Sequence, residues 1–175
     1  MVLLENDTIR LRALEPDDID VLYYWENDTS LWLYSNTKAP FSRYVLKKYL
    51  ENSQFDIYQT NELRLMIEMK ENQQAAGLID LFEFDPYHKR VGLGILVHKD
   101  YRNKGLAFDS INLLVEYCFK CLGMHQVYCN ISKSNAISLS LFKKAGFKIC
   151  GEKKEWLFQP GKPWDDELIL QKMEC

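Results

Sequence analysis

The sequence predicts an α/β (α+β) fold, in which a central mixed, mostly antiparallel, twisted sheet of about seven strands is flanked by about four helices. Two observations predict it. Strand-like runs in the middle of the chain are joined by short polar turns, which is typical of an antiparallel meander. Farther along, amphipathic helical runs separate the strand-like runs, and a helix that crosses between strands makes the sheet mixed. The 175 residues are expected to form one domain, 1–175, with enough chain to bury its own core.

The first half of the chain supplies four of the strands and two of the helices. Residues 9–14 alternate apolar side chains with arginine, which predicts a strand. The Glu-Pro-Asp-Asp run at residues 15–18 predicts the start of a helix, because proline suits the first turn and carboxylates suit the positive end of the helix dipole. Ser42 is a suitable N-cap for a second helix. The strands of the meander follow at residues 63–69, 76–84 and 92–97.

The second half alternates helices with strands. Apolar residues at steps of three to four predict an amphipathic helix from about residue 105 to 122. These residues are Ala107, Ile111, Leu114, Cys118 and Leu122. Residues 126–132 predict a strand, and Asn135 and Gly146 predict the N-cap and the end of a further helix. The chain then closes with a hairpin whose strands lie at residues 147–158 and 167–173.

A basic turn with a glycine joins the strand at residues 92–97 to the long helix. It reads Arg102-Asn103-Lys104-Gly105. The first N–H groups of a helix have no partner inside the helix and carry the positive end of its dipole. A glycine lets a ligand come close to the backbone, and the two basic side chains add positive charge. We therefore expect a phosphate or pyrophosphate to bind at this turn.

Two common phosphate-binding motifs do not fit this turn. The dinucleotide fingerprint lacks its third glycine, since Gly92 and Gly94 lie inside the strand, and the P-loop order is reversed at Lys104-Gly105. Residues 102–107 fit a different pattern, which is Arg or Gln, two residues, Gly, one residue, and Gly or Ala. This hexamer resembles the acetyl-CoA pyrophosphate loop of the GNAT superfamily of N-acetyltransferases.

A second match supports the same resemblance. In that family, the strand after the long helix is followed by a helix that begins with Asn and ends with Gly-Phe. Here Asn135 and Gly146-Phe147 stand at these places, in the same order and spacing. The resemblance runs from Ile9 to about Met173 and is closest to spermidine and ribosomal-protein N-acetyltransferases. It implies a single GNAT N-acetyltransferase domain that uses acetyl-CoA (coenzyme A) as its cofactor.

By this resemblance, the cofactor contacts the strand before the turn, the turn itself and the last long helix. The residues implied in cofactor binding are Ile95, Leu96, Val97, Arg102, Asn103, Lys104, Gly105, Leu106, Ala107, Asn135, Phe142 and Lys144. A main-chain N–H of Ile95 or Leu96 would stabilise the oxyanion if the strand diverges from its neighbour, so Leu96 is also a candidate catalytic residue. Gly92 and Gly94 are consistent with such a divergence, and a bulge without function would use the same glycines.

Acetyl transfer to an amine also needs a group that takes up the proton of the amine. Asp80 and Glu83 are the candidate catalytic carboxylates, because each lies in an otherwise apolar strand and should be partnered or functional there. Their odd separation puts them on opposite faces unless a bulge intervenes, and the alternative is that one of them ends the strand in solvent. Many relatives carry a glutamate that is implicated as the base where this chain has Gly92. In this chain, Glu83 or a relay of water molecules is therefore the favoured candidate for taking up the proton.

Phe142 is a second departure from the family. Many relatives have a tyrosine at this place, whose hydroxyl is thought to protonate the departing CoA thiolate, and phenylalanine cannot do this. Water, Ser138 or the incoming ammonium would then have to supply the proton. From the helix pattern alone, Phe142 belongs to the core.

Composition limits the class of protein. Hydrophobic residues at 47% and aromatic residues at 13% exclude disorder. No apolar run reaches membrane-spanning length, and Glu5 and Asp7 argue against a signal peptide, so the protein is expected to be cytoplasmic. Cys118 and Cys121 form a C-x-x-C, but both belong to the apolar stripe of their helix, so core residues are preferred to a redox or zinc pair. The three histidines are scattered, and no metal site is expected.

Charge is divided unevenly along the chain. Residues 1–85 hold 16 acidic and 8 basic residues, whereas residues 86–175 hold 9 acidic and 14 basic residues. This division suits an enzyme that takes a cationic amine from one side and an anionic cofactor from the other, and ordinary surface variation is the alternative. The expected acidic lining consists of Asp80, Glu83, Asp85, Glu26 and Asp28. The resemblance implies that an aromatic stretch walls the acceptor site, and packing is the alternative; its residues are Trp25, Trp32, Tyr34 and Phe41.

The expected function is acetyl-CoA-dependent transfer of an acetyl group to a primary amine, which is a small-molecule polyamine or a peptide or protein N-terminus, by direct transfer. The alternative is a catalytically weak acyl-CoA-binding regulatory protein on the same fold, which the departures at Gly92 and Phe142 motivate. Neither a nucleic acid nor a membrane is expected as a partner, since the net charge is −3 and there is no long basic stripe. A homo-oligomer is compatible with this function.

Overall fold

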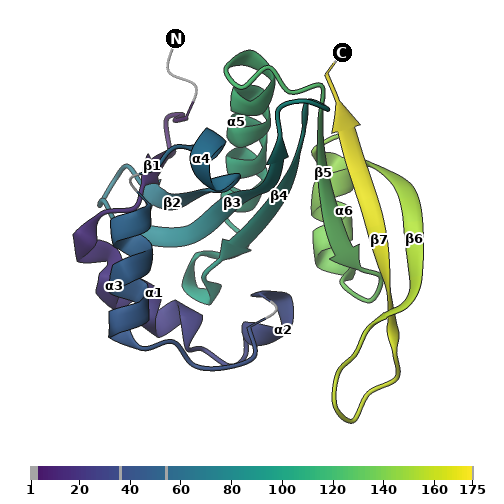
Figure 1. Cartoon of the computed structure of the whole chain (residues 1–175), viewed down its shortest axis with the longest axis horizontal. Coiled ribbons are helices and arrows are strands. Elements are labelled where there is room, and N and C mark those ends of the chain that lie inside the picture. Colours follow the sequence, from purple (N-terminus) through teal and green to yellow (C-terminus); the bar gives the residue numbers. More distant parts are fainter. Residues whose placement is uncertain (1–3, 36, 54, 175) are drawn as a thin grey trace.

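The computed structural model describes residues 4–35, 37–53 and 55–174. Within them, seven strands form one sheet in the order β1-β2-β3-β4-β5-β7-β6 (Figure 1). The strands are β1 (Ile9–Ala13), β2 (Leu63–Met69), β3 (Ala75–Asp85), β4 (Arg90–Val97), β5 (Gln126–Ser132), β6 (Lys148–Leu157) and β7 (Asp165–Met173). Every neighbouring pair is antiparallel except β4 and β5, which run parallel. The predicted mixed, mostly antiparallel sheet is therefore confirmed.

Four longer helices lie where helices are predicted, and two one-turn helices lie where none is. The helices are α1 (Ile19–Glu26), α2 (Trp32–Ser35), α3 (Arg43–Asn52), α4 (Ile57–Thr60), α5 (Leu106–Lys120) and α6 (Ala136–Lys144). The short helix α4 is stabilised locally, because Asp56 and Gln59 form a capping box. In the described part of the chain, no helix is both long enough and apolar enough to cross a membrane.

Helices cover both faces of the sheet, and each layer encloses a core of its own (Figure 1). Ile79 and Leu81 of β3 belong to the core beneath α5, which also holds the buried Cys118. Leu78 of β3 belongs to the core beneath α1 and α3. Because the side chains of a strand alternate between faces, Asp80 and Phe82 of β3 point to the same face as Leu78. The face opposite α5 therefore carries the polar side chains of the candidate site.

Arg12 of β1 joins two buried carboxylates. It donates hydrogen bonds to Asp18 at 2.8 and 2.9 Å and also contacts Glu68 of β2, which is shared with Arg10. Burial opposes the ionisation of Asp18, but hydrogen bonds from Arg12 and from the Glu15 N–H outweigh it and hold the pKa of Asp18 below its ordinary value. Burial also opposes the ionisation of Glu68, and its two arginines lower its pKa in the same way.

These lowered pKa values predict a loss of stability in acid. Unfolded carboxyl groups have pKa values of about 4, so the ion pairs are complete above that pH and are lost as the pH falls through the folded-state pKa values. Asp18→Asn should lower the free energy of unfolding at pH 7 by about 1.5–3 kcal/mol and make its fall in acid shallower. Urea titrations at several pH values measure this. The control is Asp20→Asn, since Asp20 is 76% exposed and pairs with Arg43 at the surface; an equal loss in both variants would contradict the prediction.

Candidate functional site

The neighbouring strands β4 and β5 separate partway along their length. They pair at Arg90 with Gln126, at Val91 with Val127 and at Gly92 with Tyr128, and no later pair joins these two described strands. β4 nevertheless continues to Val97 alongside β3, and β5 continues to Ser132 alongside β7. The divergence expected beside Gly92 is therefore present, and it leaves one edge of β4 without a neighbouring strand (Figure 1).

The backbone of β4 aims alternate N–H groups toward that open edge. His98, directly after β4, donates its N–H to the carbonyl of Ala76 at 2.9 Å. The register between β3 and β4 is unbroken from Gly92 to Val97, so the Leu96 N–H also points toward β3. The Leu93 N–H also faces β5, but it belongs to the last rung of the ladder between the two strands, at Tyr128. The N–H groups that point toward the open edge are those of Ile95 and Val97. As an oxyanion donor, Ile95 is therefore favoured over Leu96.

The turn between β4 and α5 presents a row of free backbone N–H groups. Gly105 is the N-cap of α5 in a left-handed conformation with φ of 78°, and the first helical bond is donated by the Asp109 N–H to the Gly105 carbonyl at 3.1 Å. Within the described part of the chain, the N–H groups of residues 103–108 have no hydrogen-bond acceptor. Residues 102–105 are exposed. Such a row at the positive end of a helix suits an anion.

Basic side chains hold or border this turn. The Arg102 Nε donates to the carbonyl of Val97 at 3.1 Å and so ties the turn to the open edge of β4. The Lys144 ammonium, at the end of α6, lies 4.6 Å from the ring centroid of Phe108 in the first turn of α5. The Lys104 ammonium lies 5.3 Å from the ring centroid of Tyr101. Lys144, which is distant in sequence, is thus brought beside the predicted anion site.

The helix α6 follows β5 in the chain and packs beside α5. Asn135 is its N-cap, as predicted, and the side chain accepts a hydrogen bond from the Ser138 N–H at 3.2 Å. Phe142 is 4% exposed and packs edge-on against Phe147, with ring centroids 5.1 Å apart. The interpretation of Phe142 as a core residue is confirmed, and its contact with a cofactor stays a prediction.

Asp80 is partnered by an arginine. Its carboxylate accepts from Arg64 at 2.7 and 3.0 Å, and Arg64 also donates to Glu26 at 2.9 Å. Burial alone would lower the pKa of Arg64, but the Asp80 carboxylate and Glu26 raise it above its ordinary value, so the guanidinium stays charged. Both Asp80 and Glu26 are therefore occupied by an ion pair that links α1, β2 and β3.

Glu83 sits on a β-bulge, which brings its side chain to the same face as Asp80. The register between β3 and β4 shifts between Phe82 and Asp85, and Glu83 has a positive φ of 49°. The Tyr128 hydroxyl of β5 donates a hydrogen bond to the Glu83 carboxylate. Burial and then the Glu83 carboxylate raise the pKa of Tyr128, so its hydroxyl remains a donor. The sequence does not predict Tyr128 as the partner of Glu83 or Arg64 as the partner of Asp80. The only signal for either is the strand alternation, which places the Tyr128 side chain on one face of β5.

A surface hollow of about 510 Å³ lies beside this β-bulge, and Glu83 forms part of its lining. Its lining residues are Glu83, Asp85, Arg90, Gln126, Tyr128, Ile169 and Gln171. Asp85 pairs with His88 at 2.8 Å and Arg90 at 3.2 Å, whereas no described Lys, Arg or His pairs with Glu83. Two of the five expected acidic residues thus line the hollow, and Glu83 is the one that is not neutralised by a cation.

The aromatic stretch before α3 is packed in part. Trp25 is 8% exposed and stacks on His98, with ring centroids 5.6 Å apart, and the Trp32 Nε1 donates to the carbonyl of Glu26 at 2.8 Å. The side chain of Tyr34 lies outside the described part of the chain. The packing alternative therefore holds for Trp25.

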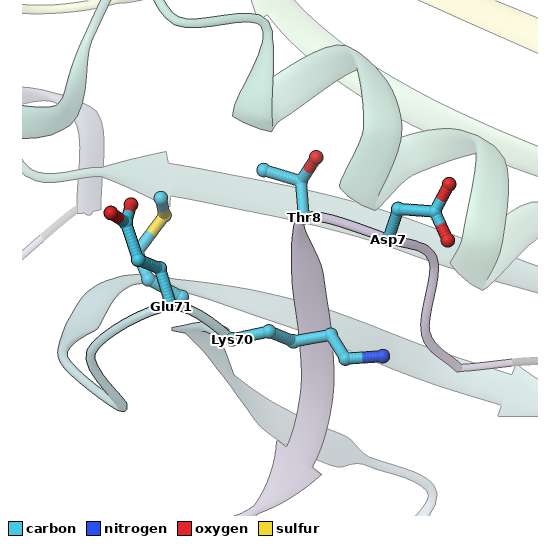
Figure 2. Close-up of a pocket in the computed structure, with 5 residues that line it drawn as sticks. Asp7, Thr8, Lys70 and Glu71 are labelled. Carbon is cyan, nitrogen blue, oxygen red and sulfur yellow. The ribbon is translucent and has the colours of Figure 1, made fainter.

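A second hollow, of about 390 Å³, lies at the β1–β2 edge and is lined by Asp7, Thr8, Met69, Lys70 and Glu71. Figure 2 shows that Glu71 lies on one side of β1, whereas Lys70 and Asp7 extend to the other side. It contains none of the predicted site residues, and we do not assign it a role in the chemistry.

Comparison with known proteins gives a consistent picture. The family model of the acetyltransferase (GNAT) domain matches residues 8–148. The chain is 28% identical over 145 residues to a spermidine N(1)-acetyltransferase of Escherichia coli (strain K12), and the match covers 83% of this chain and 75% of the relative. Its fold is similar to that of a spermidine N-acetyltransferase from Vibrio cholerae in complex with CoA and spermine, with a TM-score of 0.86, 24% identity and 96% of both chains covered. A dodecameric structure of spermidine N-acetyltransferase from Vibrio cholerae matches with a TM-score of 0.77 and 24% identity, over 96% of this chain and 95% of that one.

Proposed function

The chain belongs to the GNAT acetyltransferase family, and from this premise we propose that it moves the acetyl group of acetyl-CoA onto a primary amine of a polyamine such as spermidine. As a member of this family it is an N-acetyltransferase that uses acetyl-CoA. The polyamine is proposed because the relative in Escherichia coli acts on spermidine and because Glu83 offers an unneutralised carboxylate. A peptide or protein N-terminus remains the second candidate acceptor.

The cofactor is proposed to lie against the turn and the open edge of β4. The free N–H groups of residues 103–108 would bind the pyrophosphate, with Arg102, Lys104 and Lys144 adding positive charge. The thioester would enter where β4 and β5 have separated. There the Ile95 N–H would donate to the carbonyl oxygen and stabilise the charge that develops on it.

Glu83 is proposed to attract the cationic amine and to accept its proton, directly or through water. A primary amine is mostly protonated at neutral pH, so it must lose a proton before it can attack the thioester. The observation that carries this proposal is the bulge that turns Glu83 toward Tyr128 on the face opposite α5. Asp80 is not proposed as the base, because Arg64 binds both of its oxygens.

The transfer is proposed to be direct, without an acetylated cysteine. Burial raises the pKa of the Cys118 thiol to about 12 and that of the Cys129 thiol to about 12, so neither forms the thiolate that a nucleophile requires. Cys121 caps the far end of α5, and Cys150 lies on the edge strand β6. Neither is near the open edge of β4.

Acetyl-CoA turnover with a panel of amines tests the proposal. We expect spermidine to give a higher kcat/KM than a short peptide with a free N-terminus. Release of CoA and the mass of the acetylated product measure it. Turnover no greater than the control without enzyme for polyamines, peptide N-termini and amino acids would instead favour the acyl-CoA-binding regulator, which the comparisons do not support.

Phe142→Tyr tests the missing proton donor. An alkyl thiolate is a fair leaving group, with a conjugate-acid pKa of about 8.5, so transfer can proceed without an acid. A tyrosine hydroxyl should raise kcat by about tenfold, which is less than the full contribution of general acid catalysis, and should leave acetyl-CoA affinity unchanged. Phe147→Tyr is the matched control, because Phe147 is 2% exposed and packs against the same ring. A folded Phe142→Tyr protein with equal or lower kcat would show that the proton comes from elsewhere.

Assembly and location are proposed as well. We propose that the chain, as a single domain, forms a homo-oligomer in the cytoplasm. The dodecameric relative supports the oligomer, and the free thiols of Cys118, Cys121, Cys129 and Cys150 are in keeping with a reducing compartment. Analytical ultracentrifugation measures the assembly.

A further inference from the structure

The ring of Phe82 lies across Gly92 and Gly94, where β4 and β5 begin to separate. A Cβ atom at Gly92 would lie 2.2, 2.5 and 2.6 Å from three carbons of this ring, and a Cβ atom at Gly94 would lie 3.9 Å from a fourth. Real Cβ atoms essentially never come within 3.0 Å of another group. The ring therefore fills the space that any side chain at residue 92 would need.

The same ring also contacts the ring of Tyr128. Phe82, Gly92 and Tyr128 form one row across β3, β4 and β5, because Phe82 pairs with Gly92 and Gly92 pairs with Tyr128. The Phe82 and Tyr128 rings meet edge-on, with centroids 5.8 Å apart at 83°. Tyr128 in turn donates to Glu83. The ring thus lies beside the carboxylate and extends toward Gly94, in the direction in which the open edge of β4 runs.

We infer that Phe82 is a specificity-determining residue of the acceptor site, whose ring selects an unbranched alkylammonium chain over an amine on a branched, polar carbon. This inference rests on the proposed function. The Phe82 ring lies over Gly92 and Gly94, which directly precede Ile95 on β4. Methylene groups of the acceptor would pack on this apolar surface and be removed from water there. An ammonium group is also attracted to the face of such a ring.

A peptide N-terminus fits this surface less well. Its α-carbon carries a side chain and a carbonyl group, and both would have to pack against the face of the Phe82 ring. The ring also offers no hydrogen bond to the carbonyl group, which would lose its water on binding. One methylene group more or less in an apolar pocket changes kcat/KM by about 10-fold to 200-fold, and we expect a difference of this order between the two acceptors.

Phe82→Ala tests the inference. The ratio of kcat/KM for spermidine to kcat/KM for a short alanine-initiated peptide should fall by at least about tenfold. Acetyl-CoA affinity should remain unchanged, because no cofactor contact is proposed for Phe82. Phe82→Leu, which keeps part of the side-chain volume, should give an intermediate ratio.

Gly92→Ala provides a second, independent readout. In the wild-type background, Gly92→Ala should lower the melting temperature, because the added Cβ collides with the Phe82 ring. In the Phe82→Ala background, the same substitution should change the melting temperature little. Equal losses in the two backgrounds would overturn the inferred contact between the ring and Gly92.

The outcomes also separate this inference from the function on which it rests. Suppose that the wild-type protein acetylates spermidine and that folded Phe82→Ala keeps the ratio of the two kcat/KM values within about twofold of the wild-type ratio. The inference is then wrong and the proposed function stands. If the wild-type protein acetylates the peptide and not spermidine, or no amine at all, both are wrong.

Discussion

Replacing Gly105 with aspartate is expected to weaken acetyl-CoA binding by about a hundredfold or more. The N–H groups around Gly105 are the proposed pyrophosphate ligands, and they are free in the described part of the chain. A carboxylate at this place would face the pyrophosphate, and two like charges about 4 Å apart repel by about 4 kcal/mol at an effective dielectric constant of about 20. A hundredfold loss corresponds to only about 2.7 kcal/mol. Isothermal titration calorimetry with acetyl-CoA measures the change.

The control for Gly105→Asp is Gly123→Asp. Both glycines have a positive φ, of 78° and 64°, and in both cases nothing lies within 4 Å of an added Cβ atom. The two substitutions therefore cause similar backbone strain and add the same charge. Gly123, however, follows the C-terminal end of α5, about 20 Å away along the helix. Unchanged affinity in a folded Gly105→Asp protein, or an equal loss in both variants, would show that the cofactor site is misplaced.

Replacing Glu83 with glutamine is expected to lower kcat by about a hundredfold, the lower end of the range for general acid–base catalysis. Glutamine keeps the size of the side chain and an oxygen that can accept from Tyr128, but it cannot take up a proton. Acetyl-CoA affinity should not change, because Glu83 lies on the bulge of β3 and not on the turn before α5. Steady-state kinetics with spermidine and calorimetry with acetyl-CoA together measure both effects.

Asp85→Asn is the control for Glu83→Gln. Asp85 lines the same hollow, but its carboxylate is bound by the His88 backbone N–H and side chain and by Arg90, and backbone and side-chain hydrogen bonds from His88 lower its pKa. Its replacement should change kcat by no more than about threefold, since it is not proposed to accept a proton. If Glu83→Gln has an equally small effect, the proton of the amine leaves by another route.

The sheet could be predicted because its signals are local. Alternation at residues 9–14 and 126–132, and the apolar stripe of α5, depend on neighbours a few positions away. The one-turn helices α2 and α4 are too short to show such a period, and α4 depends on a capping box between Asp56 and Gln59. Length is therefore the physical reason why four helices could be found and two could not.

In the candidate site too, the features that are local in sequence could be predicted and those that depend on distant residues could not. The turn at residues 102–107 lies within one stretch of chain, so its row of free N–H groups could be predicted from a strand, a glycine and a helix. Glu83 and Tyr128 are 45 residues apart, and Arg64 and Asp80 lie on different strands. Their pairing depends on strand order and on the bulge at Glu83. Neither the strand order nor the bulge can be predicted from composition or from residue spacing.

Amide hydrogen exchange of β4 and the following turn tests the central claim most directly, since the claim is that acetyl-CoA binds the open edge of β4 and the free N–H groups before α5. In the free protein, the Ile95 N–H should exchange much faster than the Leu96 N–H, which points toward β3. On addition of acetyl-CoA without an amine, exchange should slow by about tenfold or more at Ile95 and at residues 103–108, the change that a bound hydrogen-bond acceptor produces, while Leu96 stays protected. Unchanged exchange at Ile95 and in the turn when acetyl-CoA is bound would contradict the account.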